Sequence, residues 1–134
     1  MATLGVRNNN PANLRPSGDK WQGMTGTNGG FMTFLTMVWG IRAAIINFRT
    51  WYKRGQTTLR KYISTYAPPN ENDTENYINY ISKMTKIAPD AVFLFNYENV
   101  KKILYYMFKL ESQYTMKLED FNTAWELATG EKKK

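Results

Sequence analysis

Apolar residues recur at helical spacing in five segments of this chain. In the segment 97–112, Val100, Ile103, Leu104 and Met107 follow one another at positions i, i+3, i+4 and i+7, on one helix face. The same periodicity predicts four more helices, over about 36–53, 57–66, 73–85 and 117–129. Their expected inward residues are Ile41, Ala44, Ile45, Phe48, Tyr52, Leu59, Tyr62, Ile63, Tyr66, Ile78, Ile81, Met84, Leu118, Phe121, Ala124, Trp125 and Ala128.

Capping residues mark the ends of these helices. Thr57 or Thr58 is expected to cap the second helix, because a threonine side chain accepts a hydrogen bond from a free N–H of the first turn. Asn72 is expected to cap the third, with Glu75 three residues later completing a capping box. Gly130 stops the last helix.

The N-terminal part of the chain differs in composition from the helical part. Residues 1–30 are rich in Asn, Gly and Pro and are interpreted as ordered loops and turns, and Phe31–Phe34 is predicted to be a short strand. Trp21, Met24, Phe31 and Phe34 are the apolar anchors of this part. The sequence therefore predicts one mostly α domain over 1–134, with about five helices and a small irregular or β segment near the N-terminus.

One carboxylate continues an apolar helix face. The next position on the stripe of the segment 97–112, after Met107, is Glu111. Partial burial disfavours the charged form of a carboxylate and raises its pKa, as a general acid at neutral pH requires. In the alternative interpretation, the helix ends after Leu110 and Glu111 points to water.

Composition narrows the possible chemistry. The chain has no His and no Cys, which excludes Ser-His-Asp and Cys-His systems and zinc sites that use these ligands. Acid–base chemistry must use Asp, Glu, Lys or Tyr, and there are only 11 acidic residues. We expect no metal and no cofactor.

The net charge of +7 favours an anionic partner, which could be nucleic acid, an anionic membrane surface or a bacterial cell wall. The basic residues are dispersed rather than gathered on one helix, so nucleic-acid binding ranks lowest. No run approaches the roughly 18 apolar residues of a membrane span.

Several motifs resemble those of known proteins. The segment from Arg7 to Arg15, Arg-Asn-Asn-Asn-Pro-Ala-Asn-Leu-Arg, resembles the opening Arg-Asn-Asn-Asn-Pro-Gly-Asn-Ile-Arg of a family of small phage and prophage proteins, labelled virion structural or lysozyme-like. Later similarities to this family are Trp21–Gly23, Phe31–Phe34, Trp39–Ala43, Tyr66–Thr74, Tyr77–Ile78 and Met107–Glu111. The resemblance covers nearly the whole chain. The family usually has Gly at Ala12, Trp at Tyr66 and Asn-Gly in place of Ser112-Gln113.

The same pieces resemble lysozyme-like muramidases and lytic transglycosylases in a different order. In those enzymes the helix that ends in the catalytic Glu comes first, whereas here it comes late. The resemblance thus implies a circularly permuted lysozyme-like domain, a rearrangement that compact domains tolerate. Glu111-Ser112 is similar to the Glu-Ser pair of many transglycosylase active sites and implies that Glu111 is the general acid.

A hydrolase with two carboxylates would also need a base or nucleophile. Glu71 is the first candidate, although it reads equally well as a solvated loop residue, and Asp73 and Asp19 stay open. A transglycosylase needs one carboxylate only, because a hydroxyl of the sugar closes on the anomeric carbon. The expected substrate-binding residues are Asn9, Asn10, Asn13, Arg7, Trp21, Tyr66 and Tyr77. Their structural alternatives are turn geometry for Asn, surface charge for Arg and core packing for the aromatic residues.

The resemblance implies a phage-type, endolysin-like peptidoglycan hydrolase or lytic transglycosylase. Its partners would be peptidoglycan glycan strands. Because Met1–Arg7 contains no apolar core of a signal peptide, we expect synthesis in the host cytoplasm and action on the cell wall, from the virion or at lysis. The alternative is a non-enzymatic virion structural or accessory protein that binds the wall or other virion proteins.

Overall fold

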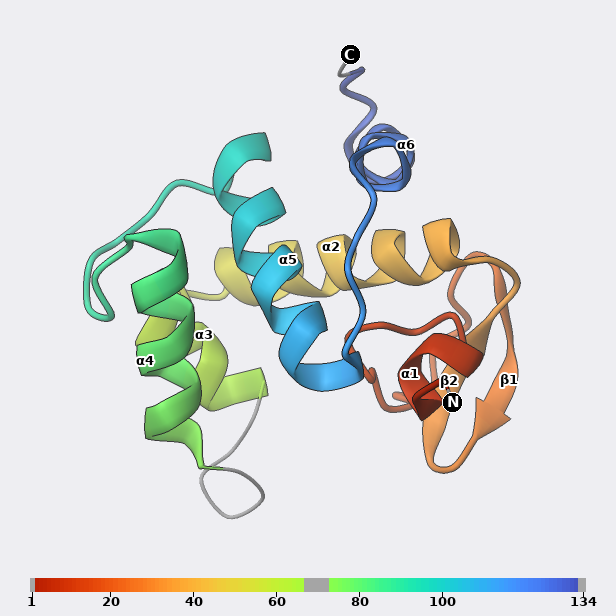
Figure 1. Cartoon of the computed structure of the whole chain (residues 1–134). Helices are drawn as coiled ribbons and strands as arrows, with labels where there is room; N and C mark the ends of the chain where they lie inside the picture. Colours follow the sequence, from red (N-terminus) through yellow and green to blue (C-terminus); the bar gives the residue numbers. More distant parts are fainter. Residues whose placement is uncertain (1, 67–72, 133–134) are drawn as a thin grey trace. The chain divides into compact units, whose positions relative to one another are not determined.

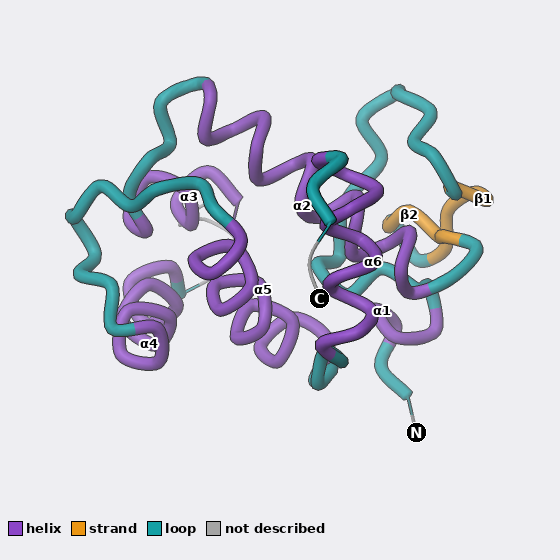
Figure 2. The backbone as a smooth tube through the Cα atoms, turned by 90° about the horizontal axis from the view of Figure 1, so that it is seen from above, coloured by secondary structure: helices purple, strands orange, loops and turns teal. Residues whose placement is uncertain are grey.

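The computed structural model describes residues 2–66 and 73–132. Within them the chain forms six helices and one two-stranded antiparallel hairpin (Figures 1 and 2). In chain order they are α1 Leu4–Arg7, β1 Met24–Asn28, β2 Phe31–Phe34, α2 Met37–Lys53, α3 Leu59–Tyr66, α4 Thr74–Thr85, α5 Tyr97–Ser112 and α6 Leu118–Thr129. The prediction of a mostly α chain with a small β segment near the N-terminus is confirmed.

The chain forms two compact units. Unit 1 comprises Met1–Ile46 and Met107–Lys134, and unit 2 comprises Asn47–Tyr106. The chain passes from one unit to the other within α2 and again within α5. The single domain over 1–134 stays a prediction.

The five predicted helices and the strand Phe31–Phe34 are present, but the interpretation of residues 1–30 as loops missed two elements. Helix α1 is a single turn that starts at Thr3, whose side chain accepts a hydrogen bond from the Val6 N–H. Strand β1 pairs with β2 around a Gly29-Gly30 turn in which both glycines have positive φ. Both elements are too short or too polar to give a periodic apolar signal.

Two helix caps depart from or refine the prediction. The side chain of Asp73 caps α4 by accepting a hydrogen bond from the Asn76 N–H at 3.3 Å. The predicted cap Asn72, and with it the predicted capping box to Glu75, lies outside the described residues; the Glu75 carboxylate pairs with Arg60. For α3 the cap is Thr58, which accepts from the Lys61 N–H at 3.1 Å.

Unit 2 has an aromatic core. The rings of Phe48 and Tyr62 stack with centroids 4.0 Å apart, and Phe93 and Phe95 meet Phe48 edge-on. The Tyr52 hydroxyl donates to the Phe93 carbonyl at 2.6 Å, which fastens the loop 86–96 to α2. Met84 was expected to face inward but is 39% exposed, because α4 buries Ile78 and Ile81 instead.

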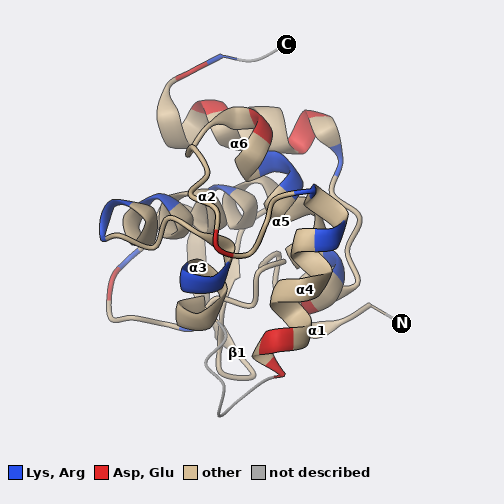
Figure 3. Ribbon diagram, turned by 90° about the vertical axis from the view of Figure 1, so that its left-hand side faces the viewer, with Lys and Arg blue, Asp and Glu red and all other residues tan. Residues whose placement is uncertain are grey.

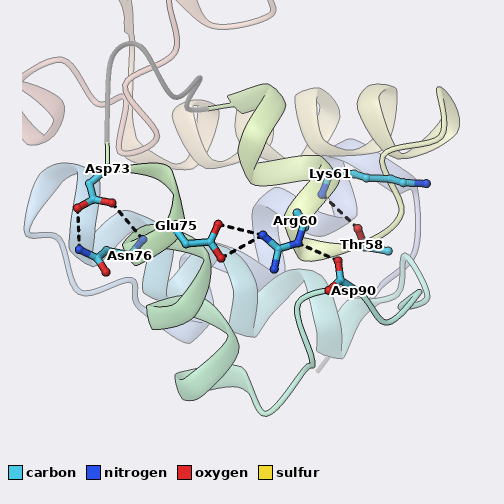
Figure 4. A network of polar contacts seen from close by, with 7 residues as sticks. All are labelled: Thr58, Arg60, Lys61, Asp73, Glu75, Asn76 and Asp90. Atoms are coloured by element: carbon cyan, nitrogen blue, oxygen red, sulfur yellow. Dashed lines mark hydrogen bonds and ion pairs between the residues drawn. The ribbon is translucent and has the colours of Figure 1, made fainter.

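A polar network on the surface of unit 2 joins α3, α4 and the loop 86–96 (Figure 4). The Arg60 guanidinium donates to Asp90 at 2.8 Å and to Glu75 at 2.9 Å, and the Arg60 N–H donates to the Pro89 carbonyl. The hydrogen bonds to Asp90 and then Glu75 raise the pKa of Arg60. Since all three side chains are exposed, the network orients the loop more than it stabilises the fold.

The core of unit 1 contains the hairpin, the first half of α2 and α6. Met32 and Phe34 alternate with half-buried neighbours along β2 and are 1% and 3% exposed. In α6, Phe121 and Trp125 are buried and their rings stack. Leu118 was expected to face inward but is 57% exposed, because it is the first residue of α6 and lies one turn before the buried face.

Candidate functional site

The candidate site lies at the C-terminal end of α5, in unit 1. The helix continues through Glu111 to Ser112, so the alternative in which it ends after Leu110 is wrong. Val100, Ile103, Leu104 and Met107 have no exposed surface, as their spacing predicted. Glu111 itself is half-buried, on the side of the last turn that meets the N-terminal segment.

The N-terminal segment holds the end of α5. The Ser112 hydroxyl is buried and donates to the Pro11 carbonyl at 2.8 Å, while the Thr3 hydroxyl donates to the Ser112 carbonyl at 2.6 Å. A Cβ on Gly5 would lie 1.8 Å from the Ser112 hydroxyl oxygen, so a side chain at position 5 would displace this contact. After Ser112 the chain leaves the helix at Gln113, whose φ is +53°.

We expect Ser112→Ala to lower the free energy of unfolding by about 1–3 kcal/mol, because the buried Pro11 carbonyl would lose its donor. Urea denaturation measures the difference. Ser17→Ala is the control, since the exposed Ser17 hydroxyl bonds only Asp19 and its loss should cost less than about 0.5 kcal/mol. Equal stability of the two variants would show that the Ser112 bond does not fasten the helix end.

Asn13 brings its side chain to Glu111. Its amide nitrogen donates to the Glu111 carbonyl at 3.0 Å and to the Glu111 carboxylate Oε1 at 3.4 Å, across 98 residues of sequence. The backbone of Asn13 has a φ of +53°, a conformation that Asn tolerates better than most residues. Its amide oxygen is buried and has no hydrogen-bond partner within the described ranges. The Asn-rich opening therefore reaches the candidate catalytic residue through Asn13.

The other asparagines of the opening organise the loop itself. The Asn10 amide donates to the Leu14 and Met32 carbonyls and accepts from the Leu14 N–H. Asn10 has no exposed surface, so the predicted sugar contact is wrong for this residue. Asn9, also at a φ of +53°, donates to the Phe34 carbonyl at 3.0 Å and is half-buried. The turn-geometry alternative thus accounts for what these two side chains do in the structure.

The remaining predicted substrate residues are spread over both units. Arg7 is exposed in the last turn of α1, and Trp21 is half-buried in unit 1. Tyr66 and Tyr77 belong to unit 2, where their rings meet edge-on with centroids 6.5 Å apart and Tyr77 is 8% exposed. Tyr77 thus packs in the core of unit 2, as its structural alternative predicted. Glu71 lies outside the described residues.

Three residues of the site were given no individual role from the sequence. Thr3 and Pro11 form hydrogen bonds with Ser112, and a side chain at Gly5 would collide with the Ser112 hydroxyl. All three residues lie more than 100 positions before Ser112 in the chain. A glycine or a proline in an Asn-rich segment predicts a turn, and no periodicity links it to a distant helix end.

The part of the chain that the structure describes contains neither a cluster of metal-ligating side chains nor a membrane-spanning helix. No group of three acidic side chains gathers there as a metal site would need, and none of the described helices is long and apolar enough to cross a bilayer. Lys and Arg occur on several elements, whereas the charged residues of α6 are all acidic (Figure 3).

The chain is thus a mostly α protein in which an Asn-rich N-terminal loop donates a hydrogen bond to a carboxylate at the end of a helix. No family model matches the chain. The chain is similar to Protein P5 of Pseudoalteromonas phage PM2, with 40% identity over 92 residues, which is 64% of this chain. The chain spans 58% of the length of that protein. This similarity associates the chain with bacteriophage proteins.

Proposed function

We propose that this chain is a peptidoglycan-cleaving glycosidase, a muramidase or lytic transglycosylase, with Glu111 as its general acid and base. The observation that supports it is the setting of Glu111, which follows four fully buried positions of α5 and receives a hydrogen bond from Asn13. A half-buried carboxyl group can hold a proton at neutral pH and still reach a ligand from its exposed side.

The proposed reaction uses this one carboxyl group twice. Glu111 gives its proton to the glycosidic oxygen as the bond from that oxygen to the anomeric carbon breaks. The resulting carboxylate then takes a proton from the nucleophile that attacks the anomeric carbon. In hydrolysis the nucleophile is water, and in transglycosylation it is a hydroxyl of the same sugar, which yields an anhydro end.

The contacts of the N-terminal segment are compatible with a lysozyme-like fold in permuted order. A permutation that moves the loop ahead of the catalytic helix must keep the two adjacent in space. Here Thr3, Pro11 and Asn13 bond to the last two residues of α5, although about 100 residues separate them. The Asn-rich loop and the Glu helix are therefore neighbours despite their order, which supports the permuted arrangement.

The similarity to a bacteriophage protein supports a phage role in either reading of the chain. A wall-cleaving enzyme carried by the virion or released at lysis fits that context. So does a non-enzymatic virion protein that binds the wall or its neighbours in the particle. The two differ in whether glycan bonds are broken.

Purified chain incubated with peptidoglycan should release soluble muropeptides, and mass spectrometry of their ends identifies the reaction. An end lighter by one water indicates an anhydro sugar and a transglycosylase, whereas a reducing end indicates a muramidase. Sedimentation of the chain with the wall, measured in the same samples, reports binding. Binding without release would contradict the enzyme proposal and favour the structural role.

A further inference from the structure

We propose that Asn13 is a positioning residue that fixes the orientation of the Glu111 carboxyl group, so that Oε1 faces the protein and Oε2 carries the transferable proton. This inference rests on the proposed function, in which Glu111 is the general acid. It assigns to Asn13 a role other than direct contact with sugar.

The geometry of the two bonds carries the inference. One amide group of Asn13 reaches both the Glu111 backbone carbonyl, at 3.0 Å, and Oε1, at 3.4 Å. The terminal torsion of a glutamate is intrinsically soft and allows a broad range of carboxyl orientations. Because the amide is fixed to the backbone of the same residue, it restrains the carboxyl plane relative to the helix end.

Asn13 is itself held in place. A Cβ on Gly5 would lie 2.9 Å from the Asn13 amide oxygen, so this oxygen packs directly on the α1 backbone, and only a glycine leaves it room. The positive φ of Asn13 sets the direction of its side chain. The packing against Gly5 and the backbone conformation of Asn13 therefore hold its amide nitrogen in a position that faces Glu111.

The bond is compatible with both states of the proposed acid. A carboxylate accepts at either oxygen, and a protonated carboxyl group still accepts at its carbonyl oxygen. With Oε1 bonded to Asn13, the proton resides on Oε2. Since a donated bond favours the charged form, the bond opposes the effect of burial, and its contribution to catalysis is orientation.

Two substitutions at Asn13 test the inference. Asn13→Gly removes the donor without backbone strain, and Asn13→Asp places a like charge at the same position while tolerating the positive φ. Asn9→Gly is the matched control, because Asn9 has the same φ but bonds β2 instead of Glu111. Two quantities are measured: the pH profile of kcat/KM for glycan cleavage and the NMR titration of the Glu111 carboxyl carbon, assigned with Glu111→Gln.

Without the hydrogen bond from Asn13, the charged form of the Glu111 carboxyl group is less stabilised, so the group keeps its proton to a higher pH. We therefore expect the alkaline limb and the Glu111 titration midpoint to rise in both Asn13 variants, by about 1 pH unit in Asn13→Asp. The plateau of kcat/KM should fall by at least about tenfold as the carboxyl group loses its orientation. Asn9→Gly should lower the melting temperature and leave the NMR titration midpoint of Glu111 unchanged.

The outcomes separate this inference from the proposed function. Unchanged titration of Glu111 in both Asn13 variants, or an equal shift in Asn9→Gly, would overturn the positioning role while leaving cleavage by Glu111 intact. Wild-type activity in Glu111→Gln, or no cleavage by the wild-type chain, would overturn the proposed function and the catalytic part of this inference with it. The NMR titration would then still decide whether Asn13 holds the carboxyl group.

Discussion

Glu111→Gln is expected to abolish glycan cleavage and to leave the fold intact. Glutamine keeps the size of the side chain and an oxygen that can accept from Asn13, but it has no proton to transfer. Loss of general acid catalysis should lower kcat by about 10²–10⁴. The measurement is muropeptide release per unit time, with circular dichroism and thermal melting of the same preparations to establish that the variant is folded.

Glu126→Gln provides the control, because Glu126 is an exposed carboxylate of α6 and should be dispensable for cleavage. If Glu111 were instead a buried partner in a structural ion pair, its substitution would lower stability by about 3–5 kcal/mol, and melting would reveal this. Wild-type cleavage by a well-folded Glu111→Gln chain would remove Glu111 from the mechanism and leave Glu71 or Asp73 as the carboxylates to test.

Gly40→Ala is expected to be the most destabilising of the glycine substitutions that keep the side chain small. A Cβ at Gly40 would lie 1.8 Å from the Asn9 carbonyl oxygen and 2.8 Å from its carbon, so backbone must move. Helix α2 would be pushed from the loop that holds Asn10 and Asn13. We expect a loss of about 3 kcal/mol, the upper end for overpacking, and a fall in melting temperature of about 10 °C.

Gly18→Ala separates crowding from backbone strain. Gly18 has a φ of +88° and no atom within 4 Å of the added Cβ, so only the left-handed conformation is penalised, by about 1 kcal/mol. Thermal melting of both variants gives the comparison. A Gly40→Ala chain as stable as Gly18→Ala would mean that α2 and the loop are not packed as closely as these distances require.

The helices were predictable from the sequence because their signals are local. The apolar stripe of 97–112 and the Gly130 stop each depend on residues within a few turns, and both are confirmed. One error arose where two neighbouring residues could both cap a helix. Asp73 is the N-cap of α4, whereas the prediction was Asn72, and the Glu75 carboxylate pairs with Arg60, 15 residues earlier in the chain.

The candidate site was predictable only in part. Glu111 was found because it continues a periodic stripe, and periodicity is a property of the helix alone. Asn9, Asn10 and Asn13 were selected as a group, because the sequence alone does not distinguish one asparagine of the loop from another. Their actual roles differ: Asn10 is buried in the loop, whereas Asn13 bonds Glu111.

The sequence by itself determined the five longer helices, the place of Glu111 on its helix and which catalytic side chains are absent. The tertiary structure decided which of several asparagines meets that carboxylate. It also decided that Gly5 and Gly40 are positions of close backbone approach. The physical reason is range: helical periodicity and caps act over a few residues, whereas a hydrogen bond between Asn13 and Glu111 depends on how the whole of unit 1 packs.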